Sequence, residues 1–147
     1  MKRFIFPLLF ILFTIPFESC GDAVRDEFPK SQFVGYFNLN YPEYSESVFT
    51  AARDMDGRRV GVNGLVIYNA GANYYAFDLM CPHEKKVSCS VKVDIENDPS
   101  VAECECCGSQ FLIASPYGEV IEGPAKQGLH PYSTGITQDN ILVVSSN

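Results

Sequence analysis

The sequence predicts an all-β fold built from antiparallel strands. After Ser31 the chain is a series of short apolar or alternating runs rich in Val, Ile, Tyr and Phe, which favour a pleated, half-buried surface. Gly, Asn, Asp and Pro interrupt these runs, as is typical of tight turns. No segment keeps an apolar 3.6-residue repeat for three full turns, so long helices are not expected.

The first thirty residues are set apart by their composition. Lys2 and Arg3 precede an apolar run over residues 4–17, and small Ser19 stands before Cys20. This order is typical of a secretory signal, and a run of about 14 residues is shorter than the roughly 20 that a transmembrane helix needs. The segment resembles a bacterial lipoprotein signal, in which the cysteine is lipidated; Glu18 is unusual there, and ordinary secretion is the alternative.

These features predict the domain organisation and the location of the protein. Residues 1–19 are expected to be a signal peptide, and residues 20–30 the lipidated N-terminus with its linker. Residues 31–147 are expected to form one β domain, because 46% of the chain is apolar and can supply a core. The protein is then exported and anchored to a membrane of the bacterial cell envelope through the acyl chains on Cys20.

The expected strands follow the apolar runs in order. The runs occupy residues 33–39, 58–70, 73–80, 89–96, 118–123 and 140–146. Residues 65–79 indicate a hairpin whose two strands meet at the Gly-containing segment 69–73. A short helical turn is the one departure from β structure that we expect, within residues 46–59.

The charge of the domain excludes one class of partner. The chain has 11 basic and 18 acidic residues, and removing the signal takes away Lys2, Arg3 and Glu18, which leaves a net charge of −8. A strongly acidic domain repels phosphate backbones, so no nucleic-acid partner is expected.

Five cysteines lie in the expected mature domain beyond Cys20, namely Cys81, Cys89, Cys104, Cys106 and Cys107. Disulfides are the default for an exported protein, but an odd number leaves one thiol over. Metal binding is the alternative, because a Cys-x-His pair and a Cys-x-x-Cys pair from two loops can surround one centre. Thiolates with an imidazole suit an iron–sulfur cluster or tetrahedral zinc, and disfavour magnesium or calcium.

Three segments, residues 76–83, 104–111 and 118–132, resemble the Rieske iron–sulfur family in order and spacing. That family has a Cys-x-His loop, a Cys-x-x-His loop followed by Gly-Ser-x-aromatic, and a Gly-Pro-Ala loop. The residues that match are Cys81, His83, Cys104, Gly108, Ser109, Phe111, Gly118, Gly123, Pro124, Ala125, Leu129 and Tyr132. The resemblance implies an antiparallel β domain with a small cluster-binding subdomain, a 2Fe–2S cluster, and single-electron exchange with a protein redox partner.

One departure from the family pattern changes the expected ligand set, because Cys107 stands where the family has its second histidine. The resemblance then implies that Cys81, His83, Cys104 and Cys107 hold the cluster. It also implies a disulfide between Cys89 and Cys106, a hydroxyl of Ser109 that donates to a cluster sulfide, and a third loop over the cluster built around Pro124. His130 is interpreted as a loop residue that is not a ligand.

Charge arithmetic predicts the direction of the redox consequence. Two ferric ions and two sulfides carry +2, so three thiolates and one neutral imidazole leave the oxidised cluster at −1, whereas the two-histidine family pattern leaves it neutral. Phe111 also stands where high-potential members have a tyrosine, which removes a hydrogen-bond donor. Both changes make reduction harder.

The export route keeps other hypotheses open. Residues 1–4 contain no twin arginine, so the signal resembles that of the general secretion route, which carries unfolded chains. A cluster would then have to be inserted after export; the other outcomes are a zinc ion in the same ligands, or a metal-free domain with disulfides. The first hypothesis is a membrane-anchored electron carrier rather than an enzyme, and the alternative is a non-redox Rieske-fold lipoprotein that serves as a binding or assembly module.

Overall fold

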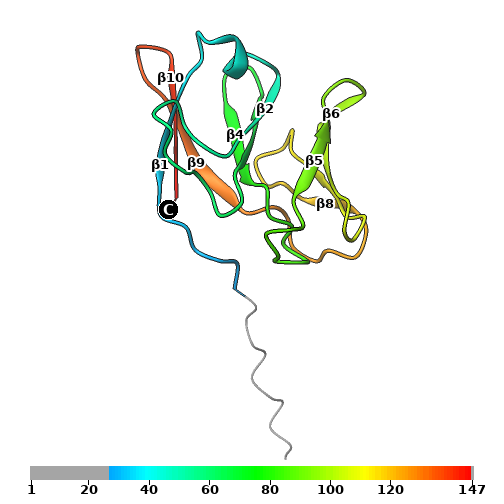
Figure 1. Cartoon of the computed structure of the whole chain (residues 1–147). Helices are drawn as coiled ribbons and strands as arrows, with labels where there is room; N and C mark the ends of the chain where they lie inside the picture. Colours follow the sequence, from blue (N-terminus) through cyan, green and yellow to red (C-terminus); the bar gives the residue numbers. More distant parts are fainter. Residues whose placement is uncertain (1–26, 147) are drawn as a thin grey trace, which may run out of the picture.

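The computed structural model describes residues 27–146 (Figure 1). The predicted signal peptide and the predicted lipidation site at Cys20 lie outside these residues. Within the described part, no helix has both the length and the apolar composition needed to cross a membrane.

The fold is antiparallel β, as the sequence predicts, and it consists of two sheets. The larger sheet has the strand order β1-β10-β9-β4-β3-β2, and the smaller sheet has the order β5-β6-β7-β8. The strands of the larger sheet are β1 (Val34–Asn38), β2 (Val48–Ala51), β3 (Leu65–Asn69), β4 (Tyr74–Asp78), β9 (Pro131–Ile136) and β10 (Ile141–Ser145). Those of the smaller sheet are β5 (Val91–Asp94), β6 (Asp98–Cys104), β7 (Gln110–Leu112) and β8 (Val120–Glu122).

In the sequence, the strands of the smaller sheet lie between β4 and β9, two strands that pair with each other in the larger sheet. β4 pairs with β9 through Ala76 with Tyr132 and Phe77 with Pro131. All of residues 79–130 lie between these strands in the sequence and include β5 to β8. Figure 1 shows the two sheets beside each other, with the small one carrying its own loops at one end. This insertion is the small subdomain that the sequence predicts.

Two apolar clusters form the core. The first lies within the larger sheet and includes Phe37, Ile67 and Leu142, all fully buried. The second joins the two sheets, since Val66 and Phe77 of the larger sheet pack with Phe111 of the smaller one. Alternation along β3 and β4 sends successive side chains to opposite faces, so the same strands serve both clusters. Two of the predicted metal ligands, Cys81 and Cys104, belong to the second cluster, and Cys107 packs against it.

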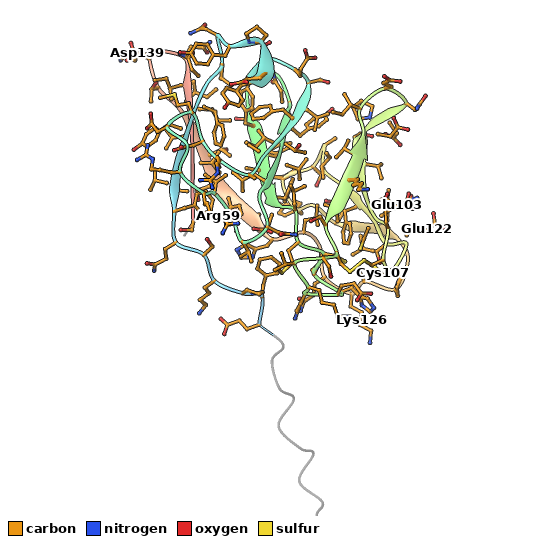
Figure 2. All side chains as sticks on the ribbon, in the orientation of Figure 1. Arg59, Glu103, Cys107, Glu122, Lys126 and Asp139 are labelled. Atoms are coloured by element: carbon orange, nitrogen blue, oxygen red, sulfur yellow. A yellow bond between two sulfur atoms is a disulfide. The ribbon has the colours of Figure 1, made fainter. Side chains whose placement is uncertain are left out.

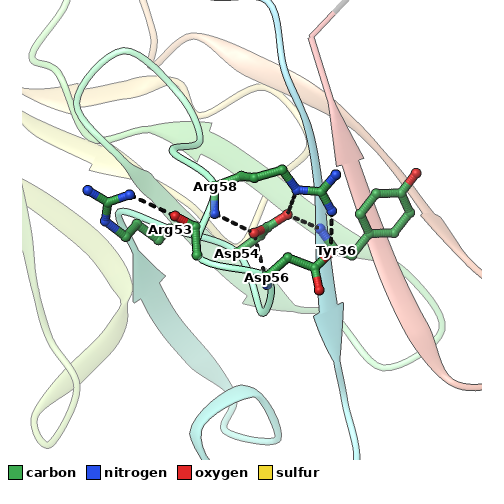
Figure 3. Close-up of polar contacts among 6 residues, drawn as sticks. Tyr36, Arg53, Asp54, Asp56 and Arg58 are labelled. Carbon is green, nitrogen blue, oxygen red and sulfur yellow. Dashed lines mark hydrogen bonds and ion pairs between the residues drawn. The ribbon is translucent and has the colours of Figure 1, made fainter.

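The prediction of a helical turn within residues 46–59 is wrong. β2 occupies residues 48–51, and the 3-10 turn of the described chain lies earlier, at Pro42–Tyr44. The segment after β2 is instead a loop organised by the buried carboxylate of Asp54, which accepts hydrogen bonds from the N–H groups of Asp56 (3.0 Å) and Arg58 (2.8 Å) (Figure 3). An aspartate that bonds its own following backbone competes with helix formation.

Asp54 also ties this loop to the neighbouring strand. Its carboxylate accepts the N–H of Tyr36 in β1 and forms an ion pair with the Arg58 guanidinium at 3.1 Å (Figure 3). Arg58 in turn lies over the Tyr36 ring, 5.2 Å from its centroid. The loop between β2 and β3 is therefore a fixed part of the scaffold, and its Asn63 side chain donates to the carbonyl of Val87 in the first cysteine loop at 2.9 Å.

An aromatic stack fixes the first described residues against the domain. Phe28 stacks on His130 with ring centroids 4.5 Å apart, and His130 meets the edge of Tyr132 at 5.1 Å. His130 is half-buried in this stack, and burial lowers the pKa of its imidazole, an effect that the nearby Asp78 carboxylate partly opposes. The chain thus enters the fold beside the start of β9.

Candidate metal centre

Two loops carry the cysteines, and each begins where a strand ends. Cys81 follows the last residue of β4 by three positions, and Cys104 is the last residue of β6. Each loop closes in a tight turn: the N–H of Lys85 donates to the carbonyl of Cys81 at 2.9 Å, and the N–H of Gly108 donates to that of Cys104 at 2.7 Å. A sulfur at the start of each turn is therefore held by a rigid strand.

The three thiols of the two loops meet in one place. The Sγ atoms of Cys81, Cys104 and Cys107 all lie within 4.8 Å of one another, and those of Cys81 and Cys107 are 3.7 Å apart. Cys81 and Cys104 are buried, whereas Cys107 is half-exposed. In Figure 2, Cys107 lies at the end of the small subdomain where its loops gather. The arrangement is a thiol cage that opens to solvent on the Cys107 side.

The environments of the Cys81 and Cys107 thiols shift their pKa values in opposite directions. Burial raises the pKa of the Cys81 thiol to about 12, and hydrogen bonds from the backbone of its own turn only partly oppose this effect. Burial would also raise the pKa of Cys107, but hydrogen bonds from the hydroxyl and N–H of Ser109, and from Cys81 and Cys104, outweigh burial and lower it. The cage therefore stabilises one thiolate at its open side and needs a cation to stabilise a second.

A disulfide joins the two loops beside the cage. Cys89 and Cys106 are bonded, with their Cα atoms 5.8 Å apart, and this is the pair that the resemblance implied. Cys106 is the immediate neighbour of Cys107, and the carbonyl of Cys89 accepts the N–H of Cys81 at 3.1 Å. The cross-link thus connects the backbone next to one cage thiol with the backbone next to another.

A third loop packs against the second through Ser109 and Gly123. The fully buried hydroxyl of Ser109 accepts the N–H of Ala125 at 3.0 Å and lies 3.2 Å from the Cys107 sulfur. Gly123 has φ +93°, and a Cβ there would lie 2.5 Å from Cα of Ser109. Only glycine permits this approach of two backbones. Pro124, between these contacts, is exposed.

The sequence reasoning missed Asp78, a fully buried carboxylate that supports the first loop. It accepts the Tyr132 hydroxyl at 2.8 Å, the N–H of Met80 at 2.8 Å and the N–H of Asn63 at 3.2 Å. Burial and the negative charge of Asp78 raise the pKa of Tyr132 well above its usual value. An aspartate inside an otherwise apolar strand, residues 73–80, was the signal that could have revealed this role.

The structure brings together three of the four predicted ligands. His83 is exposed and lies outside the group of three sulfurs. It is two residues from Cys81, on the loop that lines the open side, so it stays a predicted ligand whose ring must turn inward. His130 stacks between Phe28 and Tyr132 and is also outside the group.

The donor set fits a metal centre that prefers sulfur. The cage offers three thiols without a carboxylate among them, and soft thiolates select iron–sulfur clusters or zinc over magnesium and calcium. The hydroxyl of Ser109 accepts the N–H of Ala125 and lies 3.2 Å from the Cys107 sulfur, so its own hydrogen can be donated to that sulfur once the thiol is ionised. The fold and the site thus define a small cysteine-ligated β domain of the metal-binding class.

Comparison with known proteins identifies the family. The family model of the Rieske [2Fe-2S] domain matches residues 41–133, which is more than half of the chain. The chain therefore belongs to the Rieske family, whose cofactor is a 2Fe–2S cluster.

Two further comparisons complete this result. A search of curated proteins gave no match. Among solved structures, the chain is similar to one described as the complex of reduced oxygenase and oxidized ferredoxin in carbazole 1,9a-dioxygenase, with 20% identity and a TM-score of 0.43. That match covers 67% of this chain and 88% of the other. The assignment to the family depends on the family model and on the motifs, not on this structural match.

Proposed function

We propose that this protein is a one-electron carrier that holds its 2Fe–2S cluster through Cys81, Cys104, Cys107 and His83. The observation that carries the proposal is the gathering of three thiols at the positions of the Rieske ligand loops. When bound, the cluster supplies one reversible electron. Electron transfer to a protein partner is the function that this family membership and the cysteine-rich site support best.

The residues around the cage have separate tasks in this proposal. Cys81 and Cys104 are buried ligands, Cys107 is the ligand at the open side, and His83 completes the set from the exposed face. Ser109 donates a hydrogen bond toward the sulfur atoms, which favours the reduced form because the added electron makes them more negative.

The proposal extends to the membrane. The lipoprotein-like segment that ends at Cys20 supports acylation of that cysteine, which would anchor the domain without a transmembrane helix. The test is labelling of the full chain with radioactive palmitate in a bacterial host. Label is expected in the wild type and absent from Cys20→Ala; equal label in both would refute the anchor.

A second candidate function is supported by one distance. Two thiolates on a single tetrahedral ion with metal–sulfur bonds of about 2.3 Å are separated by about 3.8 Å, close to the 3.7 Å between Cys81 and Cys107. A single zinc ion therefore fits the cage as it stands, whereas a binuclear cluster requires the half-exposed Cys107 to turn outward. The protein would then be a structural zinc module.

One experiment separates the two candidates. The mature chain is reconstituted anaerobically with iron and sulfide, and its visible absorption, its electron paramagnetic resonance after reduction, and its iron and zinc contents are measured. A coloured protein with two irons and a signal on reduction supports the electron carrier; a colourless protein that retains one zinc supports the module. Cys104→Ser should lose the metal in either case, and His130→Ala should retain it.

A further inference from the structure

We infer that Cys81 and Cys107 form a second disulfide in the metal-free protein, and that this bond closes the cage to metal until it is reduced. The inference concerns the protein before it takes up its metal. It therefore goes beyond the proposed function and applies to an iron–sulfur cluster and to zinc alike. Cys81 and Cys107 are called the gating pair below, and the bond between Cys89 and Cys106 is called the structural disulfide.

The gating pair has the geometry of two thiols that can bond to each other. Their Sγ atoms are 3.7 Å apart, and a disulfide bond is about 2.05 Å long, so the sulfurs must approach by about 1.7 Å. Cys81 is fully buried, whereas Cys107 is half-exposed and lies in a turn. The movement can therefore come from rotation of the Cys107 side chain, without a change in the strands.

The structural disulfide already holds the two ligand loops together. It fixes Cys106, the neighbour of Cys107, to Cys89, and the carbonyl of Cys89 accepts the N–H of Cys81 at 3.1 Å. Most of the chain entropy that is needed to bring the gating pair together is therefore lost before its bond forms. Groups held in this way react much faster with each other than with the same groups in solution. A bond within the chain should thus form before a bond between two chains.

Cys104 is the competing partner for either thiol and is less suited to the bond. Its Sγ lies within 4.8 Å of both members of the gating pair. However, Cys104 is fully buried, and its backbone belongs to β6. Its N–H also donates to the carbonyl of Ser109 at 2.9 Å, which holds the base of the turn. Cys104 is therefore expected to stay a buried thiol, and it serves as the matched control.

The oxidant in this inference is a low-molecular-weight disulfide. Cys107 gives up its proton and attacks one sulfur of this disulfide, so that a mixed disulfide forms and the first small thiol leaves with a proton. Cys81 then gives up its proton and attacks Sγ of Cys107, which forms the protein disulfide and releases the second small thiol. Two protein thiols are oxidised, and one small disulfide is reduced to two thiols.

Closing the gating pair removes two of the three sulfur ligands at once. A metal needs thiolates, and a sulfur in a disulfide no longer carries that charge. The difference between this chain and the family pattern makes the bond possible, because the histidine that the family has at this position cannot form a disulfide. Cys107 would thus make metal uptake dependent on prior reduction of the protein.

Peptide mapping tests the bond itself. The metal-free full chain is treated with oxidised glutathione, its remaining thiols are blocked, and the monomer is digested with trypsin. Trypsin places Cys81 in residues 60–85, Cys89 in residues 87–92 and the second ligand loop in residues 93–126. The structural disulfide alone joins the last two peptides. The gating pair should add residues 60–85 to them, and mild reduction should release that peptide first.

Two substitutions identify the partner of Cys81. Cys107→Ser should keep residues 60–85 separate from the other peptides. Cys104→Ser should still allow all three peptides to be joined, because Cys104 is not a member of the gating pair. The opposite result in the two variants would overturn the inference. A wild type in which residues 60–85 never join the other peptides would overturn it as well.

Metal uptake tests the consequence of the bond. Cobalt(II) is the probe, because thiolate ligation colours it and no sulfide, which would itself reduce the bond, is needed. It is offered to the oxidised chain and to a chain in which the peptide map shows only the structural disulfide. The oxidised chain should stay colourless and the reduced chain should become coloured. Equal uptake by both would refute closure of the cage. A reduced chain that binds no cobalt would instead refute the proposed metal centre, whereas the peptide map would be unaffected.

Discussion

The substitution Cys107→His tests the assignment on which the redox properties depend. It restores the family's two-histidine ligand pattern and replaces a thiolate with a neutral imidazole, so the oxidised cluster changes from −1 to neutral. The site has room for the larger ring because Cys107 is half-exposed. Removing a negative charge from the centre makes reduction easier, and the midpoint potential should rise.

The size of the rise follows from the dimensions of the cage. The ligand sulfurs lie within 4.8 Å of one another, and one unit charge at about 4 Å with an effective dielectric constant of about 20 contributes about 4 kcal/mol. Since about 1.4 kcal/mol corresponds to about 59 mV for one electron, the expected rise is about 170 mV. This would move the protein from the ferredoxin side toward the usual Rieske range of roughly −150 to +300 mV.

Protein film voltammetry from about pH 6 to about pH 10 provides the measurement. The variant should also show a potential that falls as pH rises, because a bound imidazole loses its proton more readily from the oxidised form. Cys107→Ser is the control, since it removes the sulfur without adding an imidazole and should not raise the potential. A Cys107→His protein with full cluster content and an unchanged potential would refute ligation by Cys107.

Three further predictions concern the loops around the cage. Gly123→Ala should lower the free energy of unfolding by at least about 2 kcal/mol, because its Cβ would meet the Ser109 backbone. The midpoint of urea unfolding measures this loss. Gly57→Ala is the control: Gly57 also has a positive φ but no neighbour within 4 Å, so the substitution should lower the stability less. Cys106→Ser opens a cross-link between positions 17 residues apart, which should cost about 3 kcal/mol by denaturant unfolding; a loss below about 1 kcal/mol would contradict that estimate. His130→Phe should lessen the loss of stability between pH 7.5 and pH 5. Burial lowers the pKa of His130 in the folded protein, so the unfolded chain takes up a proton at this histidine first as the pH falls, and the folded state loses stability. Phenylalanine cannot take up that proton. Equal acid sensitivity in both proteins would assign the effect to other groups.

The sequence was sufficient for those features that depend on local pattern. Alternation predicted the strand class, and the hairpin around residues 69–73 is present as β3 and β4. The Cys-x-His and Cys-x-x-Cys pairs predicted that two loops would surround one centre, and the sulfurs of Cys81, Cys104 and Cys107 lie within 4.8 Å of one another. The resemblance also implied the bond between Cys89 and Cys106.

The features that escaped prediction depend on contacts between distant segments. Asp78 supports the first ligand loop through Tyr132, which lies 54 positions later in the chain, and no local pattern reveals such a partner. The segment around Asp54 favours a helical turn when only its sequence is considered. The hydrogen bonds that Asp54 accepts from the following backbone and from β1 instead hold it as a loop, and a sequence pattern does not reveal these bonds. The role of Gly123 likewise requires the neighbouring loop to be known.

The stack of Phe28 on His130 has a consequence for how far the protein can reach. Cys20 is eight residues before Phe28, and an extended chain spans at most about 3.5 Å per residue, or roughly 28 Å over this segment. If Cys20 carries the acyl chains, the linker allows Phe28 to lie no more than roughly 28 Å from the lipid attachment site. The protein's partner must then be met at the membrane surface, and electron delivery would depend on swivelling about this short tether rather than on free diffusion through the surrounding fluid.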